Sequence, residues 1–88
     1  MVNVRRSEFE IISDILTLSR NGAKKTELIY QGNLSYTQVQ KYLPFLIERQ
    51  ILEVQETKNN GNSGKLYKIT QKGTAFLEDI DKVLVHFS

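Results

Sequence analysis

The chain has 88 residues, a formal net charge of +2, 25% charged residues and no cysteine. Its length predicts a single domain over residues 1–88 with one hydrophobic core, and the lack of cysteine excludes disulfides and thiolate metal sites. No apolar run approaches the roughly 20 residues of a membrane-spanning helix, and the first residues do not resemble a signal peptide. We therefore expect a cytoplasmic protein that makes no membrane contact.

A first helix is predicted to begin after Ser7. The Ser7 hydroxyl and the Glu10 carboxylate can each accept a hydrogen bond from a backbone amide at the start of a helix. Apolar residues then recur at helical spacing, at Phe9, Ile11, Ile12, Ile15 and Leu16. Asn21-Gly22 is expected to end this helix, because glycine readily adopts the left-handed conformation that follows a helix C-terminus.

Two further helices are predicted close together. The second covers residues 24–31 and is closed by Gly32-Asn33, and the third covers residues 35–49 with Ser35 as its cap. Two helices joined by a tight turn that contains glycine are typical of a helix-turn-helix. Pro44 lies inside the third helix, where it removes one hydrogen bond, so we expect a kink or an irregular turn near Gln40.

A β-hairpin and a last helix complete the pattern. Alternating apolar and polar residues predict strands around 52–55 and 67–70, joined by a long polar tip at 58–64. Gly22-Ala23 could add a short third strand, and Thr70 is expected to cap a helix from Gln71 to about His86. The order predicts a mostly helical α+β fold, a winged helix-turn-helix, with its core in 7–73 and a C-terminal helix in 71–87.

The third helix carries residues that can contact DNA. In a helix-turn-helix the second helix enters the major groove with its N-terminal residues at the base edges. Its outward positions are Thr37, Gln40, Lys41, Pro44 and Glu48, with Gln38 at the margin. Amide, ammonium and hydroxyl groups can read base edges or hold phosphate. The alternative is an ordinary solvated helix face, which is also polar.

Lysines indicate further contacts with a polyanion. Residues 57–75 contain four lysines and no acid. We expect the hairpin tip, with Lys58, Asn59, Asn60 and Lys65, to follow a minor groove and contact the backbone, and Lys24 and Lys25 to hold a phosphate at the start of the second helix. The alternative for the hairpin is a solvated turn without a partner.

The last helix has an apolar stripe that predicts a homodimer. Its residues at heptad spacing, with two beside them, are Phe76, Ile80, Val83, Phe87, Leu77 and Leu84. Phe45 either joins this contact or covers the core. No pattern of catalytic residues, glycine-rich phosphate loop or metal-ligand spacing is present, so we expect neither an enzyme nor a cofactor nor a metal site.

Several segments together resemble an archaeal winged-helix family that includes an abundant ten-kilodalton chromatin-associated protein and predicted transcriptional regulators. They are Gly22-Ala23-Lys24-Lys25-Thr26, Ile29-Tyr30, Asn33-Leu34-Ser35-Tyr36, Lys41-Tyr42-Leu43, Tyr67-Lys68-Ile69-Thr70, Lys72-Gly73 and Phe76-Leu77. The resemblance covers about Arg6 to Leu77. It implies a double-stranded DNA-binding dimer joined by an antiparallel coiled coil of C-terminal helices, with Ser35, Tyr36, Gln38 and Lys41 on the recognition helix and residues 58–65 as the wing.

The sequence departs from that family at three places. Gln50 stands where these sequences usually have a helix-ending glycine, Pro44 replaces an ordinary helix former, and the last helix is only about 15 residues long. We expect a nucleoid-associated protein that binds double-stranded DNA, as a transcriptional regulator or a small chromatin protein. The alternative is a winged-helix protein–protein interaction module that does not bind DNA.

Overall fold

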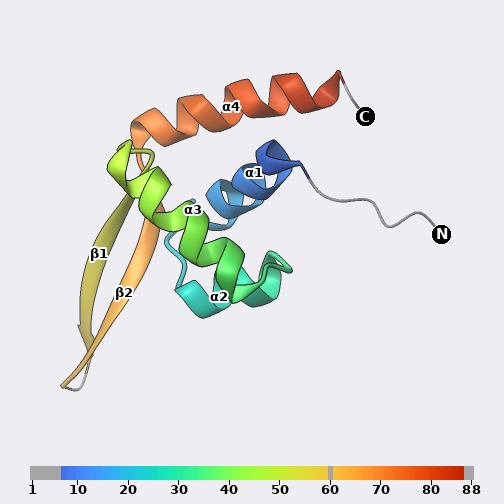
Figure 1. Ribbon diagram of the computed structural model, residues 1–88. Helices are drawn as coiled ribbons and strands as arrows, with labels where there is room; N and C mark the ends of the chain where they lie inside the picture. The colour runs from blue at the N-terminus through green and yellow to red at the C-terminus, as the bar shows by residue number, and fades with distance from the viewer. Residues whose placement is uncertain (1–6, 60, 87–88) are drawn as a thin grey trace.

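The structure of the protein, a computed structural model, describes residues 7–59 and 61–86. The described elements are α1 (Glu8–Leu18), α2 (Lys25–Gln31), α3 (Tyr36–Glu48), β1 (Leu52–Asn59), β2 (Asn62–Ile69) and α4 (Gln71–Val85). Figure 1 shows α4 lying along α1, α2 and α3 beneath them, and the hairpin projecting away from the helices. The predicted order of three helices, a hairpin wing and a last helix is confirmed, as is the α+β class.

Hydroxyl caps begin three of the helices, as the sequence predicts. The Ser7 hydroxyl accepts from the Glu10 amide at 3.1 Å, and the Glu10 carboxylate accepts from the Ser7 amide at 3.4 Å. The Thr70 hydroxyl accepts from the Gly73 amide at 2.9 Å. Ser35 caps α3 in the same manner. These contacts join residues three apart, so the sequence could indicate where these three helices begin.

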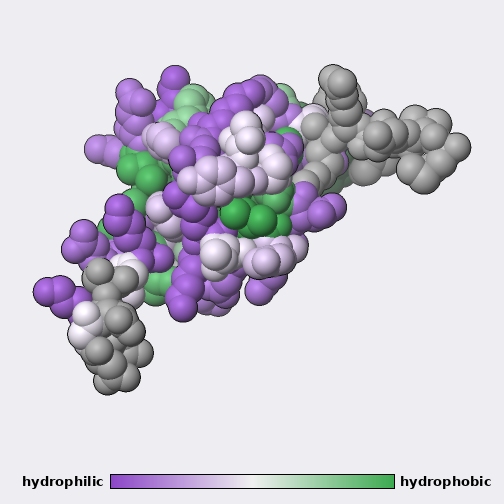
Figure 2. All heavy atoms as spheres, turned by 60° about the horizontal axis from the view of Figure 1, so that its bottom comes forward, coloured by the Kyte–Doolittle hydropathy of each residue, from purple (hydrophilic) through white to green (hydrophobic). Residues whose placement is uncertain are grey.

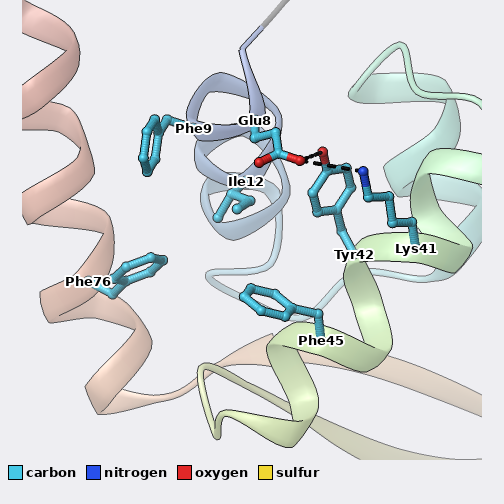
Figure 3. Close-up of a pocket in the computed structure, with 7 residues that line it drawn as sticks. All are labelled: Glu8, Phe9, Ile12, Lys41, Tyr42, Phe45 and Phe76. Atoms are coloured by element: carbon cyan, nitrogen blue, oxygen red, sulfur yellow. Dashed lines mark hydrogen bonds and ion pairs between the residues drawn. The ribbon is translucent and has the colours of Figure 1, made fainter.

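The core is formed where α1, α3 and α4 meet the base of the hairpin. Its most deeply buried apolar side chains come from all four helices and from β1, and they are Ile15, Leu16, Leu28, Val39, Leu46, Leu52 and Leu77. Phe9, which the helical spacing placed among the apolar positions of α1, is 53% exposed instead. It lies in the first turn of α1, at the mouth of a cleft between α3 and α4 (Figure 3).

Pro44 does not interrupt α3. The helix is an unbroken α-helix from Tyr36 to Glu48, so the irregular turn expected near Gln40 is absent. Pro44 lacks the amide that would bond to the Gln40 carbonyl. Both residues are exposed, so water can satisfy that carbonyl, and the buried face formed by Val39, Leu43 and Leu46 keeps the helix in place.

The hairpin is longer and its tip shorter than the sequence predicted. The strands pair from Leu52 opposite Ile69 to Asn59 opposite Asn62. The prediction of a long polar tip at 58–64 is therefore wrong, because most of these residues belong to the strands. Gly61 has a positive φ of 82°, which glycine adopts without strain and which tight hairpin turns require. On the opposite edge of β2, Ala23 forms a single antiparallel bridge with Tyr67.

Candidate nucleic-acid interface

The turn between α2 and α3 fixes the orientation of α3. Leu28, Leu34 and Val39 are buried on its inner side, and the Leu34 amide donates to the Ile29 carbonyl at 3.0 Å. The outer side of α3 is open to solvent at the five outward positions that the sequence predicted, which are Thr37, Gln40, Lys41, Pro44 and Glu48. Gln38, predicted at the margin, is half-exposed, and Tyr36 is exposed as well. The N-terminal half of α3 therefore presents a polar face.

Ser35 and Gln38, both predicted to bind DNA, bond to each other's backbone. The Ser35 hydroxyl accepts from the Gln38 amide at 3.0 Å, and the Gln38 side-chain oxygen accepts from the Ser35 amide at 2.9 Å. This capping box fixes both side chains at the start of α3. Their geometry is that of residues that position the helix, with Gln38 only half-exposed.

Lys25 and Gln40 join the two helices on the outer face. The Lys25 ammonium donates to Gln40 Oε1 at 3.0 Å and lies 5.9 Å from the centroid of the Tyr36 ring. These side chains come from the first turn of α2 and the first two turns of α3. Lys24 is exposed beside them, and its backbone amide donates to the Glu27 carboxylate at 2.9 Å.

Lys41 lies at the margin between this face and the cleft that α3 forms with α1 and α4. Its ammonium pairs with the Glu8 carboxylate of α1 at 3.4 Å, and the Tyr42 hydroxyl donates to the same oxygen at 3.3 Å. Figure 3 shows the three groups converging at one end of the cleft. The sequence did not reveal this contact, because Glu8 and Lys41 are 33 positions apart.

The register of the hairpin places Lys58 and Lys65 on one face. Residues directly opposite each other share a face, and faces alternate along a strand. Lys65 lies opposite Glu56, and Lys58 follows Glu56 by two positions, whereas Lys68 lies opposite Glu53 on the other face. Glu56 thus adds an acid beside the two lysines. The side chain of Asn59 and the whole of Asn60, both predicted to contact DNA, lie outside the described residues.

Figure 2 shows the side of the molecule that lies lowest in Figure 1, where α2, the start of α3 and the hairpin are found. Hydrophilic residues dominate this side, with smaller hydrophobic areas between them. The lysines at α2, α3 and the wing lie on elements that all reach this side. The arrangement offers ammonium groups to a polyanion and amide groups to base edges.

An apolar cleft of about 370 Å³ lies between α1, α3 and α4. Its walls are the rings of Phe9, Phe45 and Phe76, one from each helix (Figure 3). Phe45 is 40% exposed, and the Arg49 guanidinium lies 4.6 Å from the centroid of its ring. The place of Phe9 at this cleft could not be predicted, because helical spacing does not distinguish a core position from the rim of a cleft.

The residues of α4 predicted to form a dimer divide into two groups. Leu77 and Ile80 are 1% and 3% exposed in the single chain, so α1 and the rest of the core already cover them. Phe76 and Leu84 are half-buried, and Val83 is 43% exposed. Phe87 lies outside the described residues. Among the described residues of this set, the rest of the chain therefore leaves Phe76, Val83 and Leu84 at least partly open.

The described residues contain neither a candidate metal site nor a candidate membrane-spanning helix. Within residues 7–59 and 61–86, no group of three or more histidine, cysteine, aspartate or glutamate side chains could hold a metal ion. In the same residues, no helix is long and apolar enough to cross a bilayer.

The acid Asp81 of α4 takes part in packing α4 on α1. It accepts a hydrogen bond at 3.1 Å from the hydroxyl of Ser13, which is buried.

Comparison with known proteins gives a family match over residues 5–86, to a family described as winged helix-turn-helix. Two uncharacterized proteins of Methanocaldococcus jannaschii are similar to the chain, MJ0290 with 30% identity over 92% of the chain and MJ0287 with 34% over 61%. The chain spans only 35% and 57% of the lengths of these relatives.

Solved structures show the same fold. The DNA-binding protein Sso10a-2 from Sulfolobus solfataricus has a TM-score of 0.75 and 30% identity, covering 90% of this chain and 79% of its own. The circadian clock associated protein Pex from anabaena has a TM-score of 0.72 and 20% identity, and the match covers 93% of this chain and 80% of Pex. ZitR of Lactococcus lactis, solved in complex with DNA, has a TM-score of 0.61 and 16% identity, and the match covers 98% of this chain and 60% of ZitR.

Proposed function

We propose that this chain, which belongs to the winged helix-turn-helix family, binds double-stranded DNA with α3 in the major groove and the hairpin on the backbone. The observation that carries the proposal is the exposed N-terminal half of α3, where Gln40 and Lys41 lie beside Lys25 of α2. In a helix-turn-helix this part of the second helix meets the base edges. Lys58 and Lys65 share one face of the wing and would bind phosphates of any sequence.

The biological role that fits is a transcriptional regulator or a small chromatin protein of the nucleoid in the cytoplasm. Sso10a-2, at 30% identity, is a DNA-binding protein, and the fold is also that of ZitR. An enzymatic role is not part of the proposal, since catalysis needs titratable groups that converge in a pocket. The cleft between α1, α3 and α4 has mainly aromatic walls, with one carboxylate and one ammonium paired at its end.

Duplex DNA binding, measured by fluorescence anisotropy, tests this proposal. A random-sequence duplex and a duplex from the DNA upstream of the protein's own gene are compared at two salt concentrations. We expect binding to both that weakens steeply as salt rises, because lysine–phosphate contacts release counterions. A preference for the upstream duplex indicates a regulator, and equal affinity indicates a chromatin protein. No binding at low salt would contradict the proposal.

We also propose a homodimer in which α4 and the adjoining cleft of one copy meet those of a second copy. Val83 is exposed, and it lines a hollow of about 310 Å³ with Phe9 and Leu84. The main cleft adjoins this hollow through Phe9. Exposed apolar side chains that gather on one side of a small domain mark a contact with another protein. The same observation favours the second candidate function, a protein-interaction module, if DNA does not bind.

A further inference from the structure

We propose that Lys25 and Gln40 together read a guanine in the major groove, and that Lys25 sets which base Gln40 prefers. The inference rests on the proposed DNA binding and goes beyond it, because it names a base and the residues that select it. It depends on one contact, the 3.0 Å hydrogen bond from the Lys25 ammonium to Gln40 Oε1.

The contact fixes the orientation of the Gln40 amide. A lysine ammonium has donors and no acceptor, so the atom that it meets on Gln40 must be the oxygen and not the nitrogen. The opposite end of the amide, Nε2, is then left to point away from Lys25. Tyr36 supports this arrangement, because its ring lies 5.9 Å from the same ammonium and a cation near a ring face is attracted to it.

The pair therefore offers mainly hydrogen-bond donors to a base. Gln40 presents its Nε2 group, and Lys25 retains two further N–H groups. Guanine shows two adjacent acceptors in the major groove, N7 and O6, whereas adenine shows one acceptor and one donor. An unrestrained glutamine pairs with adenine through its oxygen and nitrogen together. Here Lys25 takes one of the two lone pairs of that oxygen and places a positive charge 3.0 Å from it. That charge opposes the approach of the N6 amino donor of adenine, so the pair matches the two acceptors of guanine.

The other glutamine near the start of α3 does not compete for this role. Gln38 Oε1 accepts from the Ser35 amide at 2.9 Å, and the side chain is half-buried. Gln40 lies one turn after Tyr36 and is exposed, in the part of a recognition helix that reaches base edges. Helical spacing puts Gln40 on the outward face of α3 and Gln38 at its margin, and the hydrogen bonds of the two side chains assign them different roles.

The test begins with selection of bound duplexes from a randomised library, followed by anisotropy on the enriched duplex. We expect at least one fixed G·C pair in that duplex. Replacing its guanine by 7-deazaguanine removes the N7 acceptor and preserves Watson–Crick pairing, and affinity should fall roughly tenfold. Replacing it by inosine removes only the minor-groove amino group and should leave affinity unchanged.

Two variants connect this preference to the named residues. Gln40→Ala should lower affinity for the enriched duplex roughly tenfold and abolish the effect of 7-deazaguanine. Lys25→Ala releases the Gln40 oxygen, so the preferred base should change from guanine to adenine. Lys82→Ala removes one positive charge from exposed α4 and is the matched control, and it should keep the guanine preference.

The outcomes separate this inference from the proposed function. Absence of duplex binding at low salt overturns both. Binding with a fixed adenine, with no fixed pair, or with a guanine preference that Gln40→Ala leaves intact overturns the inference alone. A guanine preference that Lys25→Ala weakens without a change to adenine shows that Lys25 supplies charge and does not orient Gln40, which also overturns the inference.

Discussion

The Glu8 carboxylate holds the Lys41 ammonium at 3.4 Å, so an acid of α1 pairs with a lysine of the proposed recognition helix. A phosphate and Glu8 would compete for the same cation. Both side chains are mostly exposed, at 69% and 65%, and an exposed pair of this kind contributes at most about 1 kcal/mol. The contact is therefore weak enough for DNA to displace.

Removing that carboxylate charge should tighten DNA binding. Glu8→Gln frees Lys41 and is expected to raise the affinity for duplex DNA by up to roughly fivefold at low salt. A fivefold change corresponds to about 1 kcal/mol, the upper end of what an exposed ion pair contributes. Glu78→Gln on α4 changes the net charge by the same amount and should have a smaller effect, since Glu78 is exposed on another element. Anisotropy titrations measure both, and equal gains would contradict a specific role for Glu8.

The wing lysines should set the salt dependence of binding. Lys58→Ala and Lys65→Ala each remove one expected phosphate contact, so each should reduce the slope of log K against log salt by about 0.9. Affinity should fall alike for all duplex sequences. Lys82→Ala is the control and should leave the slope unchanged. An unchanged slope in the wing variants would show that the hairpin does not touch the backbone.

Local signals in the sequence predicted the fold well. The caps at Ser7, Ser35 and Thr70 connect residues three apart, and each begins a helix where expected. The resemblance to archaeal winged-helix proteins is confirmed by the family match and by 30% identity to an archaeal relative. The prediction of a long hairpin tip was wrong. The residues at 58–64 individually favour turns, but the hydrogen bonds between the strands and the Asn-Gly pair favour strands that continue to the tip.

The candidate site was only partly predictable. Exposure along α3 follows from helical spacing, so the outward residues could be named. The contacts of Lys25 with Gln40 and of Glu8 with Lys41 join residues 15 and 33 positions apart. Such pairs depend on how helices pack on one another, which spacing within one helix does not determine.

Gln50 is a position where glycine should stabilise the protein. It follows α3 with a φ of 62°, the left-handed region that costs a non-glycine residue about 1 kcal/mol or more. Gln50→Gly should therefore raise the free energy of unfolding by about 1 kcal/mol and the Tm by roughly 4–8 °C. Gln50→Ala removes the same side chain and keeps the strain, so it should bring no gain. Thermal denaturation followed by circular dichroism measures both.

Gly73 should not tolerate a side chain. A Cβ at this position would collide with the Ile51 carbonyl oxygen and lie 2.7 Å from Ile69 Cγ1. Alanine usually stabilises a helix relative to glycine, but here overpacking should lower the free energy of unfolding by about 1–3 kcal/mol. Thr74→Ala, at the exposed next position, is the control with a small expected effect. A gain in stability for Gly73→Ala in urea denaturation would contradict the close approach of α4 to the hairpin base.

The proposed homodimer predicts that one flank of α4 controls association. Val83→Asp places a charge beside Phe9 and Leu84 in the apolar hollow, and burying an unpaired charge between two copies is unfavourable, so sedimentation velocity should show a shift from dimer to monomer. Val85→Asp introduces the same charge at an exposed position two residues on, which points to a different side of the helix, and should leave the dimer intact. If both variants remain dimeric, the contact lies elsewhere. If the unmodified chain is monomeric, the homodimer is contradicted, and the cleft lined by Phe9, Phe45 and Phe76 becomes the surface on which to look for a different protein partner.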